Sequence, residues 1–211
     1  MVKIDDKLDN LKQVVLHMAT LINTMYTKVY TCLETMDVDK ALEVIKMDEF
    51  VNRCEEDVND TAIECLALLS PVASDLRKVI AAIKITSDLE RIGDYSKNIA
   101  SFVIKNDSLD DETKTMTKEI MDEFLTMLDH AMDAYAKEDS KWAMQIPSED
   151  EIINKKFKEI SDRLRTSNNY QIDEIINIAQ MIRNIERAGD HTKNICEHII
   201  YQTKGQHIEF D

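Results

Sequence analysis

The decapeptide ERIGDYSKNI spans residues 90–99, and a close copy, ERAGDHTKNI, spans residues 186–195. Seven of the ten paired residues are identical, at an offset of 96 residues (186 − 90). A shorter pair, DEFVN at 48–52 and DEIIN at 150–154, is offset by 102 residues (150 − 48). The difference of six residues (102 − 96) is what an insertion in one loop produces, because loops tolerate changes in length. These two echoes predict an internal duplication.

The composition predicts that the duplicated unit is helical. The chain has only 3 Gly and 2 Pro among 211 residues, and apolar residues recur at steps of three and four. We expect a first helix that ends near residues 35–40, where Asp37 or Asp39 caps the next helix. Further helices are expected at about 39–69, 70–105, 109–137, 147–165 and 170–204, with turns at residues 138–142 and 166–170 and a cap at Ser108 or Asp110.

Six helices with short connections are typical of helical bundles. Together with the duplication they predict an all-α protein of two tandem three-helix bundles related by an internal pseudo-repeat. We place repeat 1 in residues 1–107 and repeat 2 in residues 108–211.

Charge and hydropathy exclude several classes of function. The formal net charge of −15 disfavours nucleic acid and anionic lipid as partners. No apolar run is long enough to insert in a membrane, and the first ten residues, MVKIDDKLDN, lack the apolar core of a signal peptide. We therefore expect a cytoplasmic protein, whose four cysteines, without a CxxC pair, are reduced thiols in or near the core.

The repeated strings carry paired oxygen ligands. Residues four apart share one face of a helix, so two carboxylates or a carboxylate and an amide point at one spot. The candidate metal ligands are Glu90 with Asp94, Glu186 with Asp190, Asp48 with Asn52, and Asp150 with Asn154. If the helices that carry them are antiparallel neighbours, the pairs converge. Oxygen ligands with no thiolate suit hard cations such as Mg²⁺, Ca²⁺ or Mn²⁺, and iron is also compatible.

Two other interpretations of the same residues stay open. The acids can form a solvated face or a salt-bridge network with Arg91, Arg187, Lys97 and Lys193. The two arginines are either clamps that orient the acids or ordinary ion pairs between helices. Gly93 and Gly189 occupy one position of the repeat, where glycine costs about 1 kcal/mol relative to alanine in a helix. They allow close approach to the backbone, by a neighbouring helix or by a bound ion cluster.

Two longer segments contain the repeated strings: SDLRKVIAAIKITSDLERIGDYSKNIA at 74–100 and RNIERAGDHTKNICEHIIYQTKGQ at 183–206. Both resemble the PhoU family of bacterial and archaeal phosphate-signalling accessory proteins. The resemblance covers nearly the whole chain and implies two three-helix bundles, often in homodimers. It also implies metal clusters on the pairs named above, with the metal open among iron, manganese, magnesium, calcium and zinc. Asn52 and Asn154 are neutral, so they are weaker ligands than aspartate.

The resemblance implies a regulator and not an enzyme. Members act as negative regulators of the phosphate-starvation response, as adaptors between the ATPase of the phosphate ABC importer and a two-component sensor kinase. Alternatives are a metalloenzyme that uses the carboxylate cluster, an accessory protein of a low-affinity phosphate permease, and a purely structural helical protein. The first of these is weakened by the absence of a Glu-x-x-His pattern.

Overall fold

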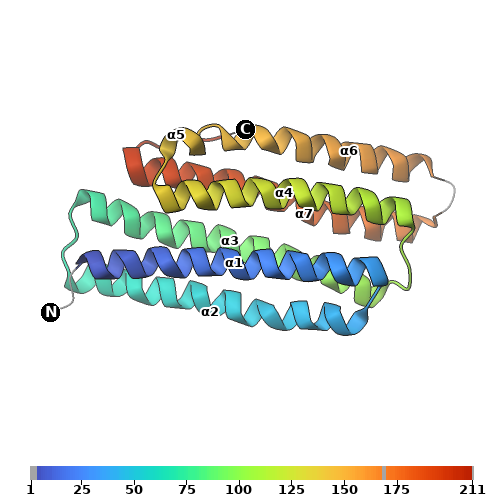
Figure 1. Ribbon diagram of the computed structural model, residues 1–211, viewed down its shortest axis with the longest axis horizontal. Helices are drawn as coiled ribbons and strands as arrows, with labels where there is room; N and C mark the ends of the chain where they lie inside the picture. Colours follow the sequence, from blue (N-terminus) through green and yellow to red (C-terminus); the bar gives the residue numbers. More distant parts are fainter. Residues whose placement is uncertain (1–3, 168–169, 211) are drawn as a thin grey trace.

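The computed structural model describes residues 4–167 and 170–210. Within these residues six long helices run along one common axis (Figure 1). They are α1 (Ile4–Thr35), α2 (Val38–Leu68), α3 (Ala73–Lys105), α4 (Asp111–Lys137), α6 (Asp150–Thr166) and α7 (Ile172–Lys204). The predicted turn at residues 166–170 falls partly on residues 168 and 169, which lie outside the described residues.

The helix ends follow local chemistry that the sequence contains. The Asp37 side chain accepts a hydrogen bond from the Lys40 amide at 3.1 Å, and Asp110 does the same for Thr113 at 3.1 Å, so these two of the predicted caps are confirmed. At the other end of α7, Gly205 adopts φ 67° and donates its amide to the Tyr201 carbonyl at 2.8 Å.

The connection after α4 differs from the prediction. We expected a turn at 138–142 and a helix from about residue 147, but a short helix α5 (Ser140–Ala143) and a 3₁₀ helix η1 (Ile146–Glu149) precede α6. The Asp139 carboxylate accepts from the amides of Lys141 and Trp142, both at 3.0 Å, and so starts α5. Pieces of four residues are too short to show a hydrophobic period, which is why the sequence pattern missed them.

The six long helices form two bundles, which confirms the predicted fold class. Helices α1, α2 and α3 pack together, α4, α6 and α7 pack together, and the bundles meet through α3 with α7 and α1 with α4. Figure 1 shows the two groups stacked along their length. The dividing line between residues 107 and 108 falls in the connection from α3 to α4 and stays a prediction.

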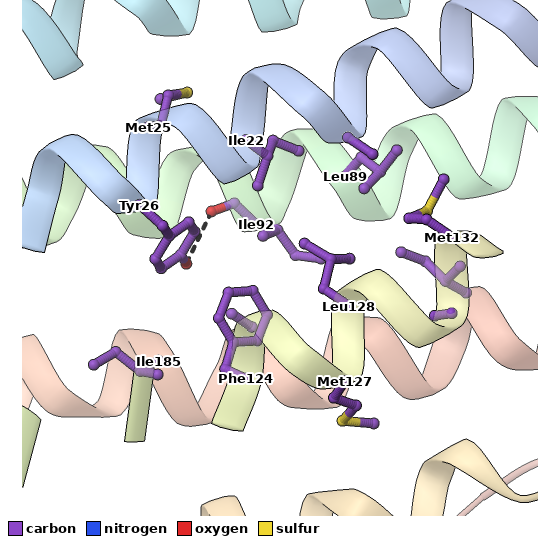
Figure 2. Close-up of a cluster of buried hydrophobic side chains, with 14 of the residues drawn as sticks. Ile22, Met25, Tyr26, Leu89, Ile92, Phe124, Met127, Leu128, Met132 and Ile185 are labelled. Atoms are coloured by element: carbon purple, nitrogen blue, oxygen red, sulfur yellow. Dashed lines mark hydrogen bonds between the residues drawn. The ribbon is translucent and has the colours of Figure 1, made fainter. Parts of the chain in front are cut away.

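Both bundles contribute to one hydrophobic core. At its centre the Tyr26 ring of α1 lies 4.8 Å from the Phe124 ring of α4, centroid to centroid, and both side chains are fully buried. The Tyr26 hydroxyl donates to the Ile92 carbonyl at 3.2 Å, so its polar end is satisfied (Figure 2). The four cysteines are buried and unpaired, as predicted.

Candidate metal centres

In the first bundle, α2 and α3 bring two of the predicted acids together. Asp48 lies on α2, Asp94 lies on α3, and the Lys97 ammonium stands between them, 2.6 Å from Asp48 Oδ2 and 2.6 Å from Asp94 Oδ1. Asp48 is only 8% exposed. Asn52 is exposed and forms no hydrogen bond with a described residue, so it is not held beside these acids.

The second bundle repeats this arrangement. The Lys193 ammonium lies 2.9 Å from Asp150 Oδ2 and 3.0 Å from Asp190 Oδ1. Asn154 differs from its counterpart in the first bundle, because its side-chain amide donates to Asp150 Oδ2 at 2.8 Å. The duplicated strings therefore build the same aspartate–lysine–aspartate bridge twice, each time between two helices.

The lysines keep their positive charge in these bridges. Burial lowers the pKa of Lys97, but hydrogen bonds to Asp48 and Asp94 outweigh it, and the pKa lies above its ordinary value. The pKa of Lys193 is raised against burial in the same way, by Asp150 and Asp190. A cation that enters either bridge therefore competes with a bound ammonium.

The two glutamates lie in a less favourable environment. Burial and then the Asp94 carboxylate raise the pKa of Glu90, and burial followed by Asp190 raises that of Glu186. Arg91 is exposed, and its guanidinium group lies 3.6 Å from Glu90 Oε2 and 3.5 Å from Asp94 Oδ2. Its counterpart Arg187 forms no ion pair within the described residues.

Gly93 and Gly189 let neighbouring helices approach closely. A Cβ on Gly93 would lie 3.2 Å from a Val51 methyl group, and a Cβ on Gly189 would lie 2.6 Å from Asp150 Oδ1. The second glycine therefore makes room for the buried carboxylate that Lys193 holds, whereas the first makes room for a core valine.

We expect Gly189→Ala to destabilise the protein by about 1–3 kcal/mol, although alanine favours a helix by about 1 kcal/mol. The new methyl group collides with Asp150, which is 3% exposed and tied to Lys193. Gly93→Ala is the matched control, since a valine methyl group can shift by a few tenths of an ångström, and its stability should change by less than about 1 kcal/mol. Urea unfolding measures both, and equal midpoints for the two variants would contradict the prediction.

The oxygen donors of these residues suit a metal ion, but the ion would compete with the ammonium groups of the two lysines. Within the part of the chain that the structure describes, no group of three or more His, Cys, Asp or Glu side chains is arranged to hold a metal ion. Among the candidate ligands, three buried carboxylate oxygens nevertheless lack a hydrogen-bond partner: Asp48 Oδ1, Asp150 Oδ1 and Glu186 Oε2. Unpartnered buried oxygens are the donors that a hard cation prefers.

A further polar cluster, which sequence reasoning missed, joins the two bundles. Asp88 of α3 accepts hydrogen bonds from His191 Nδ1 at 2.8 Å and from the Asn194 amide at 3.1 Å. Its other oxygen lies 3.1 Å from His198 Nε2. Tyr95 is the repeat counterpart of His191, and its hydroxyl lies within hydrogen-bond distance of His191 Nε2, at 3.1 Å. The replacement of Tyr95 by His191 in the repeat was a signal of this cluster in the sequence.

The repeat counterpart of this cluster is neutral. At the offset of 96 residues, Asp88 corresponds to Asn184 and Asn194 corresponds to Asn98. The Asn98 side chain donates to Asn184 Oδ1 at 3.4 Å. The same pair of positions is therefore in contact in both repeats, but only the Asp88 contact carries a charge. The two sides of the contact between α3 and α7 have therefore diverged.

Comparison with known proteins agrees with this architecture. The sequence profile of the PhoU domain matches residues 15–103 and again residues 109–199. The chain therefore belongs to the PhoU family, as its sequence motifs suggested.

Curated relatives match over most of their length. The phosphate-specific transport system accessory protein PhoU of Serratia marcescens is 32% identical over 206 residues, which cover 96% of this chain and 85% of that protein. The protein of the same name from Escherichia coli K12 is 29% identical over 204 residues, covering 95% and 85%. These are names of accessory proteins and not of enzymes, in accordance with the prediction that the chain is not an enzyme.

Solved structures are similar over the whole fold. The phosphate transport system regulatory protein PhoU from Streptococcus pneumoniae superposes with a TM-score of 0.90 at 27% identity, covering 99% of this chain and 100% of that one. PhoU from Pseudomonas aeruginosa gives 0.88 at 27% identity, covering 97% and 100%. Among the described residues, no helix has the length and apolar character needed to cross a membrane.

Proposed function

We propose that this chain is an accessory and regulatory protein of phosphate transport that works by binding other proteins. In this role it restrains the phosphate-starvation response, as a cytoplasmic homodimer that links the ATPase of a phosphate ABC importer to a sensor kinase. The observation that carries the proposal is the match of both repeats to relatives named as accessory or regulatory proteins of phosphate transport.

The surface supports a protein-binding role. Six large hydrophobic side chains of α2 are exposed: Val38, Leu42, Phe50, Ile63, Leu66 and Leu68. Contiguous exposed apolar patches mark surfaces that bind other proteins, and we propose that these side chains contribute to such a surface. The chain has a net charge of −15, which repels acidic partners at long range.

Affinity capture tests the adaptor role directly. The tagged protein is recovered from phosphate-replete and phosphate-starved cells, and the co-purified proteins are identified by mass spectrometry. We expect an importer ATPase or a sensor kinase, in larger amounts when phosphate is plentiful. A Phe50→Glu variant places a charge on the exposed face of α2 and should reduce recovery. Recovery of neither partner in either condition would refute the adaptor role, and recovery of a low-affinity permease would move the role to that carrier.

We also propose that the paired acids bind a metal ion. The ion would lie where the ammonium of Lys97 or Lys193 lies, between two aspartates of neighbouring helices. When bound, it would cross-link the helices and neutralise the acids, and no catalytic step is assigned to it. Support comes from the oxygen-only donor set and the three unpartnered carboxylate oxygens.

Competition with lysine gives a sharp test of this metal proposal. Lys193→Met removes the ammonium and should strengthen Mn²⁺ binding by at least about tenfold, or about 1.4 kcal/mol. Asp150→Asn with Asp190→Asn should abolish binding at the second site. Calorimetric titration of chelator-treated protein with Mn²⁺, Mg²⁺, Ca²⁺, Zn²⁺ and iron measures these affinities. Absence of saturable binding in both the unmodified protein and Lys193→Met would reject the proposal.

A further inference from the structure

A groove lies between α3 and α7, around the neutral contact of Asn98 with Asn184. It has a volume of about 490 Å³, and its walls come from both bundles. Three cations line it: Lys105 of α3, with Arg183 and Arg187 of α7. Asn98 and Asn184 supply side-chain amides at its base. None of the described side chains that line this groove is a carboxylate.

The cations of the groove are available to a ligand. Lys105, Arg183 and Arg187 form no ion pair within 4 Å among the residues that the structure describes. Other described basic side chains also form no ion pair, so what distinguishes the groove is that three cations share one hollow that no carboxylate lines. Glu186 does not line it, although Arg183 and Arg187 interact with its carboxylate electrostatically. The groove concentrates positive potential on an otherwise acidic molecule.

The internal repeat gives a direct comparison for the groove. At the repeat-related contact of the two helices, Asp88 pairs with His191 and His198. In the groove, Asn184 replaces that aspartate, and Arg183 stands where the first repeat has Ser87. The first change removes a carboxylate that would repel an anion and pair with the arginines. The second change adds a cation. Both changes favour the binding of a negatively charged ligand.

The donors in the groove match phosphoryl oxygens. A guanidinium group presents paired N–H donors that fit phosphate, and amide side chains add neutral donors. The volume lies within the range of small-molecule sites, roughly 300–1,000 Å³, and exceeds what one orthophosphate fills. We propose that this groove binds a phosphate-bearing anion with more than one phosphoryl group, either an inorganic phosphate chain or a nucleotide. Binding itself is independent of the proposed adaptor role, and only its use as a signal of phosphate supply rests on that role.

The test measures binding of inorganic tripolyphosphate and of ATP to the full chain by calorimetry at near-physiological ionic strength. Arg183→Gln with Arg187→Gln should weaken binding by at least about tenfold. Arg53→Gln with Arg165→Gln removes the same charge from exposed sites on α2 and α6, and should change affinity by less than about twofold. Asn184→Asp restores the carboxylate of the opposite side and should weaken binding to the same extent as loss of the arginines. All these side chains except Asn184 are exposed, and urea midpoints verify that each variant folds.

The outcomes separate the possible sources of the anion. Tighter binding of ATP than of tripolyphosphate identifies a nucleotide as the ligand, and equal or weaker binding of ATP identifies the phosphate chain. Equal losses in the groove pair and the surface pair would overturn the proposal, because they would mean unspecific attraction. Absence of saturable binding of either anion would overturn it as well. Capture of an importer ATPase or sensor kinase can still succeed in that case, so failure of the groove is distinct from failure of the adaptor role.

Discussion

Replacing Phe124 with alanine is expected to destabilise the protein by about 3–5 kcal/mol. The side chain is fully buried where α1 and α4 join the two bundles, and its ring lies against Tyr26 (Figure 2). Alanine leaves a cavity there that the flanking helices close only in part. It also removes the aromatic contact, which adds about 0.5–1.5 kcal/mol to simple burial.

The same variant tests whether the bundles unfold together. Because one core spans both bundles, we expect a single cooperative transition that moves to lower urea concentration without splitting. Phe50→Ala is the control, since Phe50 is 51% exposed and its loss should change stability by less than about 0.5 kcal/mol. Two separate transitions in the unmodified protein would show that the bundles are independent, contrary to this expectation.

Replacing Asp88 with alanine should cost about 2–4 kcal/mol at neutral pH. The carboxylate is 8% exposed and satisfies His191, Asn194 and His198 of the opposite bundle. Its loss leaves these half-buried groups without their acceptor. Asn184→Ala is the matched control at the counterpart position and should cost less than about 1 kcal/mol, because the Asn98–Asn184 contact is long, neutral and exposed.

The contribution of Asp88 depends on pH in a defined direction. Burial raises the pKa of Asp88, but hydrogen bonds from His191, His198 and Asn194 outweigh it, and the pKa lies below its ordinary value of 3.8. The unfolded chain therefore takes up the proton first as pH falls. The stabilisation is complete above pH 3.8 and is lost as pH falls through the lower pKa of the folded state. Urea midpoints across this acid range should fall less steeply for Asp88→Ala than for the unmodified protein, and parallel curves would contradict the assignment.

Much of the candidate site was predictable because the repeat placed its acids in register. The i, i+4 spacing put Glu90 and Asp94 on one face, and the paired echoes indicated that α2 and α3 meet there, as Asp48 and Asp94 do. The role of Lys97 was open, because a lysine one turn after an aspartate is compatible with a solvated face. Lys97 is a bridge between helices only because the Asp48 carboxylate of α2 lies 2.6 Å from its ammonium group.

The sequence by itself determined the all-α class, the duplication and most helix ends, because hydrophobic period and capping act within a few residues along the chain. Tertiary structure alone decided which groups meet across the bundles. Asp88 reaches His191 from 103 positions away in the sequence. The packing of α3 on α7 forms that cluster at one place in their contact and a cationic groove at the repeat-related place. Such pairings depend on the relative rotation of two helices, which is set by side chains throughout the shared core and not by any local pattern.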